Sequence, residues 1–433
     1  MNDRLHVELF ERPVGEVGIS GSLRSPEDWT FAYEPQYLAS PAPVSLSVGL
    51  PLRAEPFSGA LVRNWFCNLL PEGPVREAIE TRLRIPARDD FALLAAIGGE
   101  CAGAVSIGQR SCDGDPAPDE ETDLETLLYL QGHDAGEGAW ASLGTPHRLS
   151  LAGAQDKIAV VVEPDGRLRL PARNEFSTHI LKPDSRRFRG LRDLEALGLA
   201  LARAAGLDVC NAALVEVSGR NALLVERFDR APGPDGTIDR LHQEDFCQAL
   251  GYPAEMKYES QGGPTLARCS NLIRQLALGP IALAGFLDWV VFNAVIGNAD
   301  AHGKNLSMLC GPDGRRKLAP GYDLVPTIAI PESLIERSPA LRIGNAARID
   351  AIAAGDWRGF ATQAGYAPRY VLDRVAATTT VVLDVLNATG GQVIANGANA
   401  ARIERALRTI GANAERMREG VGARGITGKA SRV

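Results

Sequence analysis

The sequence predicts an α+β fold built from a small β-rich module, a β-rich lobe and an α-helical lobe, in that order along the chain. Two sets of short runs with strand-like alternation, at residues 4–53 and 157–228, predict two separate sheets. From about residue 240 onward, apolar residues recur mostly at helical spacing, which predicts a mainly helical region. A chain of 433 residues is long enough for two or three folding units.

The first part of the chain predicts strands followed by helices. HVELF (6–10) and WTFAYE (29–34) alternate as strands do, and PVSLSVGLPL (43–52) is a third candidate strand bounded by prolines. Helices are expected at 60–85, on both sides of a Pro-containing turn, and at 89–98, which begins with two carboxylates.

An acidic stretch separates this module from the rest. CDGDPAPDEETD (112–123) is rich in Pro, Gly and Asp, which predicts an exposed linker. We therefore expect an N-terminal module at residues 1–110, a linker and lead-in at 111–145, a β-rich lobe at 146–232 and a helical lobe at 233–433.

The second half of the chain combines a sheet with helices. The strands of the second sheet are expected at 157–162, 168–172, 178–182, 211–219 and 221–228. Helices are expected at 190–207, 354–366, 368–388 and 398–420. NLSMLCGPDGRRKLAP (305–320) predicts a hairpin with a Pro-Asp-Gly turn.

The composition is that of an ordinary globular protein, with 45% hydrophobic and 23% charged residues. The net charge of −7 gives no general reason to bind nucleic acid or an anionic membrane. The sequence has no apolar run long enough to span a bilayer, and its first residues lack the features of a secretion signal. The seven cysteines form no CxxC and the six histidines form no HxxxH or HExxH, so we expect free thiols in a reducing cytoplasm and no dedicated zinc site.

A polar cluster follows the apolar run FLDWVVFNAVI (286–296). Asp300 and Asn305 have the five-residue spacing that kinase catalytic loops use for the base and a metal-binding amide. Asp323, just past the expected hairpin, adds a second carboxylate, and such hard oxygen donors are the ligands that Mg²⁺ prefers. Each residue alone is explained by the end of a helix or by a turn, but the combination favours phosphoryl transfer. His302 differs from the Lys common in protein kinases, and the DxHxxN order is similar to that of phosphatidylinositol-type lipid kinases.

The β-rich lobe contains weaker signals for a nucleotide. Ala152, Gly153 and Ala154 precede a strand, and small residues let backbone N–H groups approach a phosphate, although an ordinary tight turn is the commoner explanation. Ser150, at the start of this loop, has a hydroxyl that could receive phosphate. Lys182 is the last residue of an expected strand. This position fits either a lysine that pairs with phosphates or an ordinary surface lysine.

Two further features fit the same interpretation. Glu195 lies on the next expected helix, where it either orients Lys182 or belongs to a solvated face. LLVERFDR (223–230) ends a buried strand, and its backbone could face an adenine with Phe228 against the ring.

Seven short motifs together resemble one family. SLAGAQDK, STHILKP, VERFDR, LHQEDFCQALG, KYESQGGP, GNADAHGKN and GYDLVPT occur in this order in HipA-type toxin kinases. FCNLLPEGPVRE and the strands before it resemble the N-terminal module of that family, so the resemblance covers roughly residues 5–390. It implies a bilobed protein-kinase-like fold, with a β-rich N-lobe, an α-helical C-lobe and the additional N-terminal module. It also implies a serine/threonine protein kinase that is the toxin of a type II toxin–antitoxin pair.

The resemblance implies ATP and Mg²⁺ as cofactors and assigns roles to residues. Asp300 is the implied catalytic base, Asn305 and Asp323 are the implied Mg²⁺ ligands, and Ser150 matches an autophosphorylated serine whose modification silences the enzyme. The residues implied to bind ATP, by side chain or backbone, are Ala152, Gly153, Ala154, Gln155, Asp156, Lys157, Lys182, Glu226, Arg227, Phe228, His302, Gly303, Lys304, Asn305, Tyr322 and Asp323.

The resemblance also implies partners. These are a small helix-turn-helix antitoxin of the HipB type, DNA only indirectly through that antitoxin, and no membrane. The implied substrate is a translation component, such as an aminoacyl-tRNA synthetase and notably the glutamyl enzyme, whose phosphorylation arrests growth and leads to antibiotic tolerance. Two alternatives stay open: a kinase that acts on a small molecule or lipid, and a non-catalytic subunit that bridges antitoxin dimers on DNA.

Overall fold

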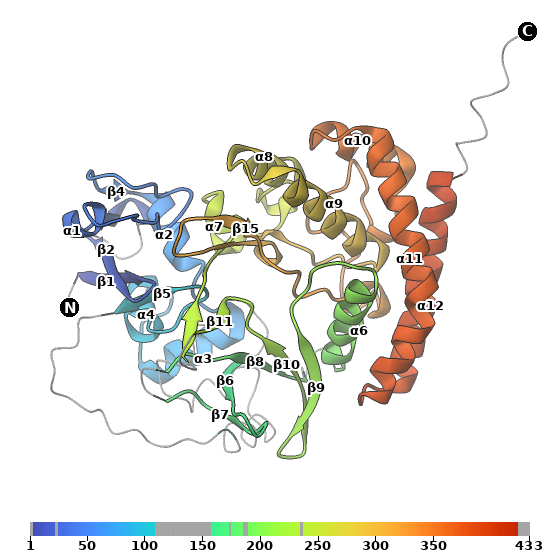
Figure 1. Ribbon diagram of the computed structural model, residues 1–433, viewed down its shortest axis with the longest axis horizontal. Coiled ribbons are helices and arrows are strands. Elements are labelled where there is room, and N and C mark those ends of the chain that lie inside the picture. The colour runs from blue at the N-terminus through green and yellow to red at the C-terminus, as the bar shows by residue number, and fades with distance from the viewer. Residues whose placement is uncertain are drawn as a thin grey trace, which may run out of the picture. The chain divides into compact units, whose positions relative to one another are not determined.

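The computed structural model shows an α+β protein (Figure 1). It describes residues 3–21, 25–108, 124, 157–172, 175–184, 189–233 and 237–422. The chain divides into two compact units. Unit 1 comprises residues 1–187, 215–255 and 307–319, and unit 2 comprises residues 188–214, 256–306 and 320–433.

The described strands form two five-stranded sheets, a two-stranded sheet and a three-stranded sheet. Their bounds are β1 (Arg4–Leu9), β2 (Arg12–Ile19), β3 (Trp29–Tyr33), β4 (Phe57–Ser58), β5 (Val105–Gly108), β6 (Ile158–Val162), β7 (Leu168–Arg169), β8 (His179–Pro183), β9 (Ala212–Val217), β10 (Arg220–Glu226), β11 (Arg230–Pro232), β12 (Ile238–Arg240), β13 (His242–Asp245), β14 (Ser307–Cys310) and β15 (Arg316–Leu318).

The described helices have the bounds α1 (Pro35–Leu38), α2 (Ala60–Cys67), α3 (Gly73–Leu83), α4 (Asp90–Ile97), α6 (Leu191–Ala204), α7 (Phe246–Ala249), α8 (Leu266–Gln275), α9 (Gly279–Val295), α10 (Ala354–Gln363), α11 (Pro368–Ala395) and α12 (Ala400–Gly422). None of the helices within these described ranges is both long enough and apolar enough to cross a membrane. Six cysteines fall in the described part, and all six are free thiols, as expected.

The first sheet has the antiparallel order β4-β3-β2-β1-β5. It contains the strands that the alternation at 6–10 and 29–34 predicted. The sequence did not predict β2. The turn that joins it to β1 places Phe10 and Glu11 at positive φ (53° and 58°), where Gly or Asn is the usual marker of a hairpin.

The predicted strand at 43–52 is wrong, because no strand forms there. Side chains bind this segment's backbone instead of a neighbouring strand. The Tyr37 hydroxyl accepts from the Val44 N–H (2.9 Å) and donates to the Val44 carbonyl (2.8 Å). The Tyr33 hydroxyl accepts from the Leu46 N–H (2.8 Å). Backbone groups paired in this way need no strand ladder.

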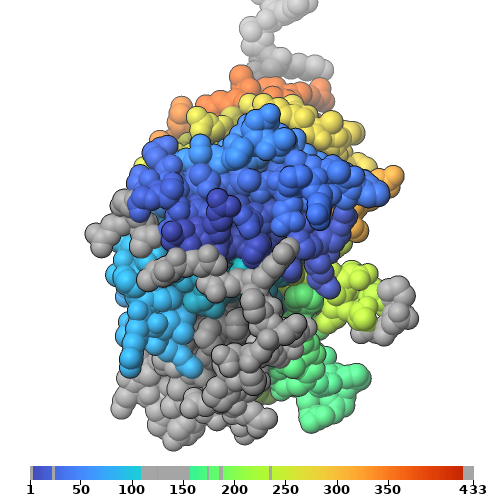
Figure 2. All heavy atoms as spheres, turned by 90° about the vertical axis from the view of Figure 1, so that its left-hand side faces the viewer, coloured from blue at the N-terminus to red at the C-terminus, as the bar shows by residue number. Residues whose placement is uncertain are grey.

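The core of unit 1 is shared by its two large sheets. Phe66 of helix α2 packs against Phe31 of β3, and both belong to one hydrophobic cluster with Trp29 and Trp65. All four are fully buried. Four residues from the second sheet belong to the same hydrophobic cluster: Ile158, Val160, Leu181 and Ala222. On the outside, the N-terminal residues form one continuous surface, the blue region of Figure 2.

The second sheet has the order β7-β6-β8-β10-β9, so β8 lies at its centre. The predicted hairpin at 305–320 is confirmed as β14 and β15, with Gly314 at a φ of +75° in the turn. The sequence did not predict that β13 adds to this hairpin, with His242 opposite Cys310.

Unit 2 is mainly helical, and α11 and α12 lie side by side with α6 and α9 packed against them (Figure 1). Helix α11 continues beyond its expected end at residue 388. A Cβ at Gly390 would lie 2.4 Å from Leu407 Cδ1, so this glycine allows the close approach of α12 and does not end the helix.

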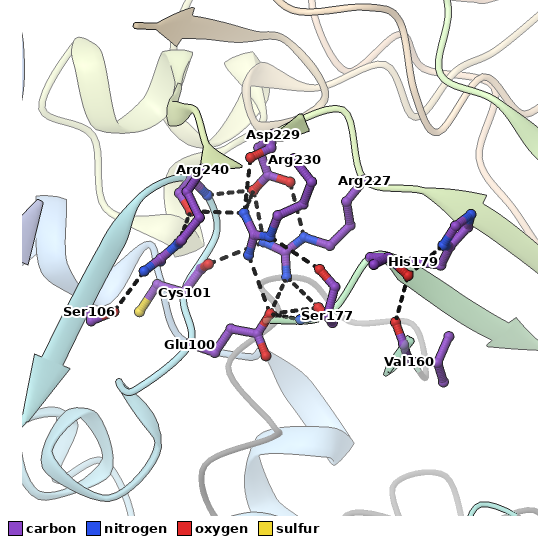
Figure 3. Close-up of polar contacts among 12 residues, drawn as sticks. Glu100, Cys101, Ser106, Val160, Ser177, His179, Arg227, Asp229, Arg230 and Arg240 are labelled. Atoms are coloured by element: carbon purple, nitrogen blue, oxygen red, sulfur yellow. Dashed lines mark hydrogen bonds and ion pairs between the residues drawn. The ribbon is translucent and has the colours of Figure 1, made fainter. Parts of the chain in front are cut away.

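A buried ion-pair network joins the end of β10 to the loop before β5 (Figure 3). The Arg227 guanidinium donates to Glu100 Oε1 (3.0 Å) and to both carboxylate oxygens of Asp229 (3.0 and 2.8 Å). All three side chains are buried. Because an unpaired charge is costly in the interior, removing one member leaves the others without compensation.

Two more arginines extend this network. Arg230 lies 3.3 Å from Glu100 Oε1 and 3.1 Å from Asp229 Oδ2. Arg240 donates to the carbonyl of Gly103 in the same loop and to that of Val105, the first residue of β5. Burial and the neighbouring Arg227 lower the pKa of Arg230 to about 10. Burial alone would raise the pKa of Asp229, but Arg227 and Arg230 together hold it well below its usual range. Asp229 is therefore ionised at neutral pH.

Replacing Arg227 tests whether this network holds unit 1 together. Arg227→Met is expected to lower the free energy of unfolding by about 3 kcal/mol, because two buried carboxylates lose a partner while Arg230 still faces both. Urea unfolding followed by circular dichroism measures the change.

The matched control is Arg167→Met, which removes an exposed ion pair with Asp165 in the same unit. Exposed pairs contribute little, so no measurable change is expected there. Equal stability of the two variants would show that the buried network does not stabilise the fold.

Candidate active site

The polar cluster begins at the end of the buried helix α9. Gly297 has a φ of +70°, and its N–H donates to the Ala294 carbonyl (3.1 Å). The Asn298 N–H donates to the Asn293 carbonyl (2.8 Å). These two hydrogen bonds form a Schellman motif, which ends a helix at a left-handed residue and turns the chain away.

A side chain from α12 adds hydrogen bonds to two carbonyls at this helix end. Asn413 is 4% exposed, and its amide donates to the carbonyls of Ala294 and Val295, both at 2.9 Å. Arg416 in turn donates to the Asn413 side-chain oxygen (2.9 Å), which fixes the orientation of the amide. Without Asn413, these buried carbonyls would lose a donor, at a free-energy cost.

The segment after Asp323 braces the same turn. Thr327 is buried, and its hydroxyl donates to the Gly297 carbonyl (3.0 Å) and accepts from the Ala299 N–H (2.8 Å). The Ile328 N–H also donates to the Gly297 carbonyl (2.9 Å). A Cβ at Gly297 would lie 2.5 Å from the Ile328 Cβ, so only glycine fits here.

The loop from Asp300 to Asn305 is closed by its own hydrogen bonds. The Asn298 side chain accepts from the Asp300 N–H (3.1 Å). The Asp300 carbonyl accepts from the His302 N–H (2.9 Å) and from the Asn305 side-chain amide (3.1 Å). The five-residue spacing therefore corresponds to a compact turn in which the Asn305 amide nitrogen faces the backbone of Asp300.

Asp323 lies beside this loop. The Asn298 amide approaches the Asp323 carbonyl (3.4 Å), and the Tyr322 hydroxyl donates to the Lys304 carbonyl (2.6 Å). Asp323 has a φ of 52°, a left-handed conformation that is uncommon for residues other than glycine and is frequent at functional sites. The structure thus brings Asp300, Asn305 and Asp323 into one region of unit 2.

The loop is electrostatically unusual. His302, Lys304 and Asn305 are each less than 10% exposed. Burial, and after it the cation of Lys257, lowers the pKa of His302 well below its ordinary value, although Asp323 opposes this. The imidazole is therefore neutral at neutral pH. Its Nδ1 makes no hydrogen bond within the described structure.

The donor atoms fit Mg²⁺ better than a transition metal. Among the described residues, no three His, Cys, Asp or Glu side chains are grouped as a metal cage. Because the Asn305 amide nitrogen is bonded to the backbone, the roles of its two side-chain atoms are assigned, and the oxygen is the atom left to meet a cation. One carboxylate and one amide oxygen are a suitable protein contribution for Mg²⁺, which keeps several waters or phosphate oxygens.

In unit 1, Lys182 is 4% exposed on the central strand β8, opposite Leu223 of β10. It is therefore not the surface lysine that the sequence also allowed. Glu195 on α6 of unit 2 is 1% exposed, so it does not belong to a solvated helix face.

The predicted adenine-facing segment lies at the end of β10, also in unit 1. The Glu226 side chain is exposed and the Phe228 side chain is half-buried, whereas Arg227 is buried in the network of Figure 3. The Arg227 N–H donates to the Thr178 carbonyl (3.0 Å). Both the side chain and the N–H of Arg227 thus have structural partners.

The other predicted site residues come before β6 in the sequence. Lys157 is half-buried directly before that strand. Ser150, Ala152, Gly153, Ala154, Gln155 and Asp156 lie outside the described residues.

Sequence reasoning missed Asn413 and Thr327 as supports of the site. A signal for Asn413 exists, because it interrupts the apolar stripe of Ile403, Ala406, Ile410 and Met417 along the buried face of α12. A polar residue on such a stripe needs a partner. No comparable local signal marks Thr327.

Comparison with known families accounts for most of the chain. Residues 5–108 match the family described as HipA N-terminal domain, and residues 149–386 match the HipA-like C-terminal domain.

Related proteins have matching lengths. Y4mE of Sinorhizobium fredii, named as a candidate kinase, is 39% identical over 90% of this chain and 94% of its own. The serine/threonine-protein kinase toxin HipA of Shewanella oneidensis is 30% identical over 74% of each chain.

A solved structure shows the same fold. A chain of the Shewanella oneidensis MR-1 complex of HipA, HipB and operator DNA superposes with a TM-score of 0.80, covering 97% of this chain and 98% of that chain at 24% identity. This likeness confirms the expected kinase-like α+β fold. With both family regions matched in order, the chain belongs to the HipA family of kinases.

Proposed function

We propose that the protein is an ATP- and Mg²⁺-dependent serine/threonine protein kinase and the toxin of a type II toxin–antitoxin pair. The observation that carries this proposal is that Asp300 and Asn305 share one compact loop of unit 2 and that Asp323 lies beside it. The named serine/threonine-protein kinase toxin of Shewanella oneidensis, 30% identical, supports the choice of substrate hydroxyl. A silent binding subunit would not need this combination of a carboxylate, an amide and a strained second carboxylate.

Asp300 is the proposed catalytic base. Phosphoryl transfer requires that the substrate hydroxyl be oriented and lose its proton, which a carboxylate at this position in a kinase loop can accept. The backbone of Asp300 is held from three sides, by Asn298, His302 and Asn305. Such rigidity favours catalysis because a base must be held within hydrogen-bonding reach of its proton.

Asn305 and Asp323 are the proposed Mg²⁺ ligands. Bound Mg²⁺ would neutralise charge on the phosphates and hold them in place. The backbone of Asp323 is left-handed, which is a strained conformation for a residue other than glycine. Such strain is retained where surrounding contacts hold it and is common at functional sites, which supports this role.

Further residues are proposed to bind the nucleotide. Lys182, buried on β8, is assigned to the α- and β-phosphates. Neutral His302, with an unpartnered Nδ1, is assigned to the nucleotide. The other proposed contacts are the backbone of 152–157, Glu226 to Phe228, Gly303, Lys304 and Tyr322.

The regulation and partners extend the proposal. Ser150 is the proposed autophosphorylation site, and a phosphoryl group of about −1.5 to −2 charges there would repel ATP phosphates. A HipB-type helix-turn-helix antitoxin is the proposed partner, supported by the complex of HipA, HipB and operator DNA that the fold matches. The proposed substrate is an aminoacyl-tRNA synthetase, such as the glutamyl enzyme, in the cytoplasm.

Asp300→Asn tests the proposed base. The variant is expected to lose at least about a hundredfold in phosphate transfer from [γ-³²P]ATP and to lose growth arrest, because the amide cannot accept the proton. Asp373→Asn, on the exposed face of α11, is the matched control and should behave as wild type. Full toxicity and transfer in Asp300→Asn would overturn the assignment.

Ser150→Ala tests self-phosphorylation. Mass spectrometry of the purified variant after incubation with MgATP should find no phosphate in the loop, while transfer to substrate proteins continues. Ser333→Ala, an exposed serine of unit 2, should keep the modification. Phosphate on another residue of the same loop would contradict the assignment to Ser150.

A further inference from the structure

The KYESQGGP segment (257–264) contains a tyrosine that contacts the proposed base. The Tyr258 hydroxyl donates a hydrogen bond to Asp300 Oδ1 at 2.8 Å. The motif had no role in the sequence interpretation beyond resemblance. This contact places Tyr258 beside the proposed reacting groups, but Tyr258 is not itself one of them.

Backbone hydrogen bonds hold this segment independently of the hydroxyl. The Lys257 carbonyl accepts from the Gly303 N–H (3.2 Å). On the other side, the Glu259 N–H donates to the Ala340 carbonyl (2.9 Å), and the Ala340 N–H donates to the Ala299 carbonyl (2.8 Å). Both ends of the loop that carries Asp300 are therefore tied to residues adjacent to Tyr258.

The Tyr258 ring is also fixed in direction. It lies edge-on to the His302 ring, with centroids 5.3 Å apart and an interplanar angle of 88°. The Lys257 ammonium lies 5.7 Å from the Tyr258 ring centroid. These ring contacts hold the Tyr258 hydroxyl facing Asp300, and they do not involve the hydroxyl oxygen.

We propose that Tyr258 is a positioning residue for Asp300. This inference rests on the proposed function. During transfer, the substrate oxygen forms a bond to the γ-phosphorus, the bond from that phosphorus to the β-bridging oxygen breaks, and ADP leaves. The hydroxyl proton of the substrate passes to Asp300, while Tyr258 keeps its own proton. By binding Oδ1, Tyr258 restricts rotation of the carboxylate and directs Oδ2 toward the substrate.

A Tyr258→Phe variant removes the hydroxyl that donates to Asp300 and keeps the ring that packs against His302. It therefore tests the hydrogen bond and leaves the packing of the ring in place.

The experiment compares wild type with Tyr258→Phe in single-turnover self-phosphorylation by Mg[γ-³²P]ATP. The rate at saturating ATP is expected to fall about tenfold, because a hydrogen bond that holds the proposed base in place is lost. The Kd for ATP, measured by calorimetry, and the melting temperature should stay near those of wild type. Tyr258→His, which keeps a ring and an N–H donor, should recover part of the rate.

Tyr366→Phe is the matched control, because it removes a hydroxyl that donates to the Leu283 carbonyl (2.8 Å) in the same unit. It should leave the rate unchanged. A normal rate in Tyr258→Phe, or the same loss in Tyr366→Phe, would overturn the inference while leaving the proposed function intact. Absence of any transfer by wild type would overturn both.

Discussion

The candidate site depends on how one buried helix ends. The last carbonyls of α9 lie in the interior, where leaving them unpaired would cost free energy. Gly297, Asn298 and Asn413 meet this requirement with the Schellman turn and two amide hydrogen bonds. The same contacts direct the chain out of the helix, so Asp300 follows at a defined position. The hydrogen bonds that satisfy the end of α9 therefore also fix the position of the proposed base.

Residues of a single motif serve chemistry and structure side by side. In GNADAHGKN, Asn298 bonds to the backbone of Asp323 and Asp300, whereas the carboxylate of Asp300 is bonded by Tyr258. In VERFDR, Arg227 and Asp229 belong to a buried ion-pair network. Membership of a motif does not distinguish these roles, because the residues proposed for chemistry and the structural residues are both polar. Burial and partners separate them.

Sequence patterns predicted those strands, turns and helices that interactions between nearby residues determine. The strands β1 and β3, the hairpin of β14 and β15, and the long helices were visible as periodicity and turn chemistry. Two failures involve side-chain contacts that periodicity along the chain does not show. The segment 43–52 alternates like a strand, but tyrosine hydroxyls bind its backbone. The spacing of Asp300 and Asn305 predicted the loop, whereas its supports, Asn413 and Thr327, come from other parts of the chain.

The central claim is that the loop is formed before any ligand binds, and hydrogen–deuterium exchange of the protein without nucleotide tests it most directly. Six backbone amides of residues 298–305 donate to partners within unit 2: Asn298, Ala299, Asp300, His302, Gly303 and Asn305. They are expected to exchange slowly in the free protein, with little further slowing when MgATP is added. Exchange of these amides as fast as in an unstructured peptide, with protection appearing only with MgATP, would contradict the account.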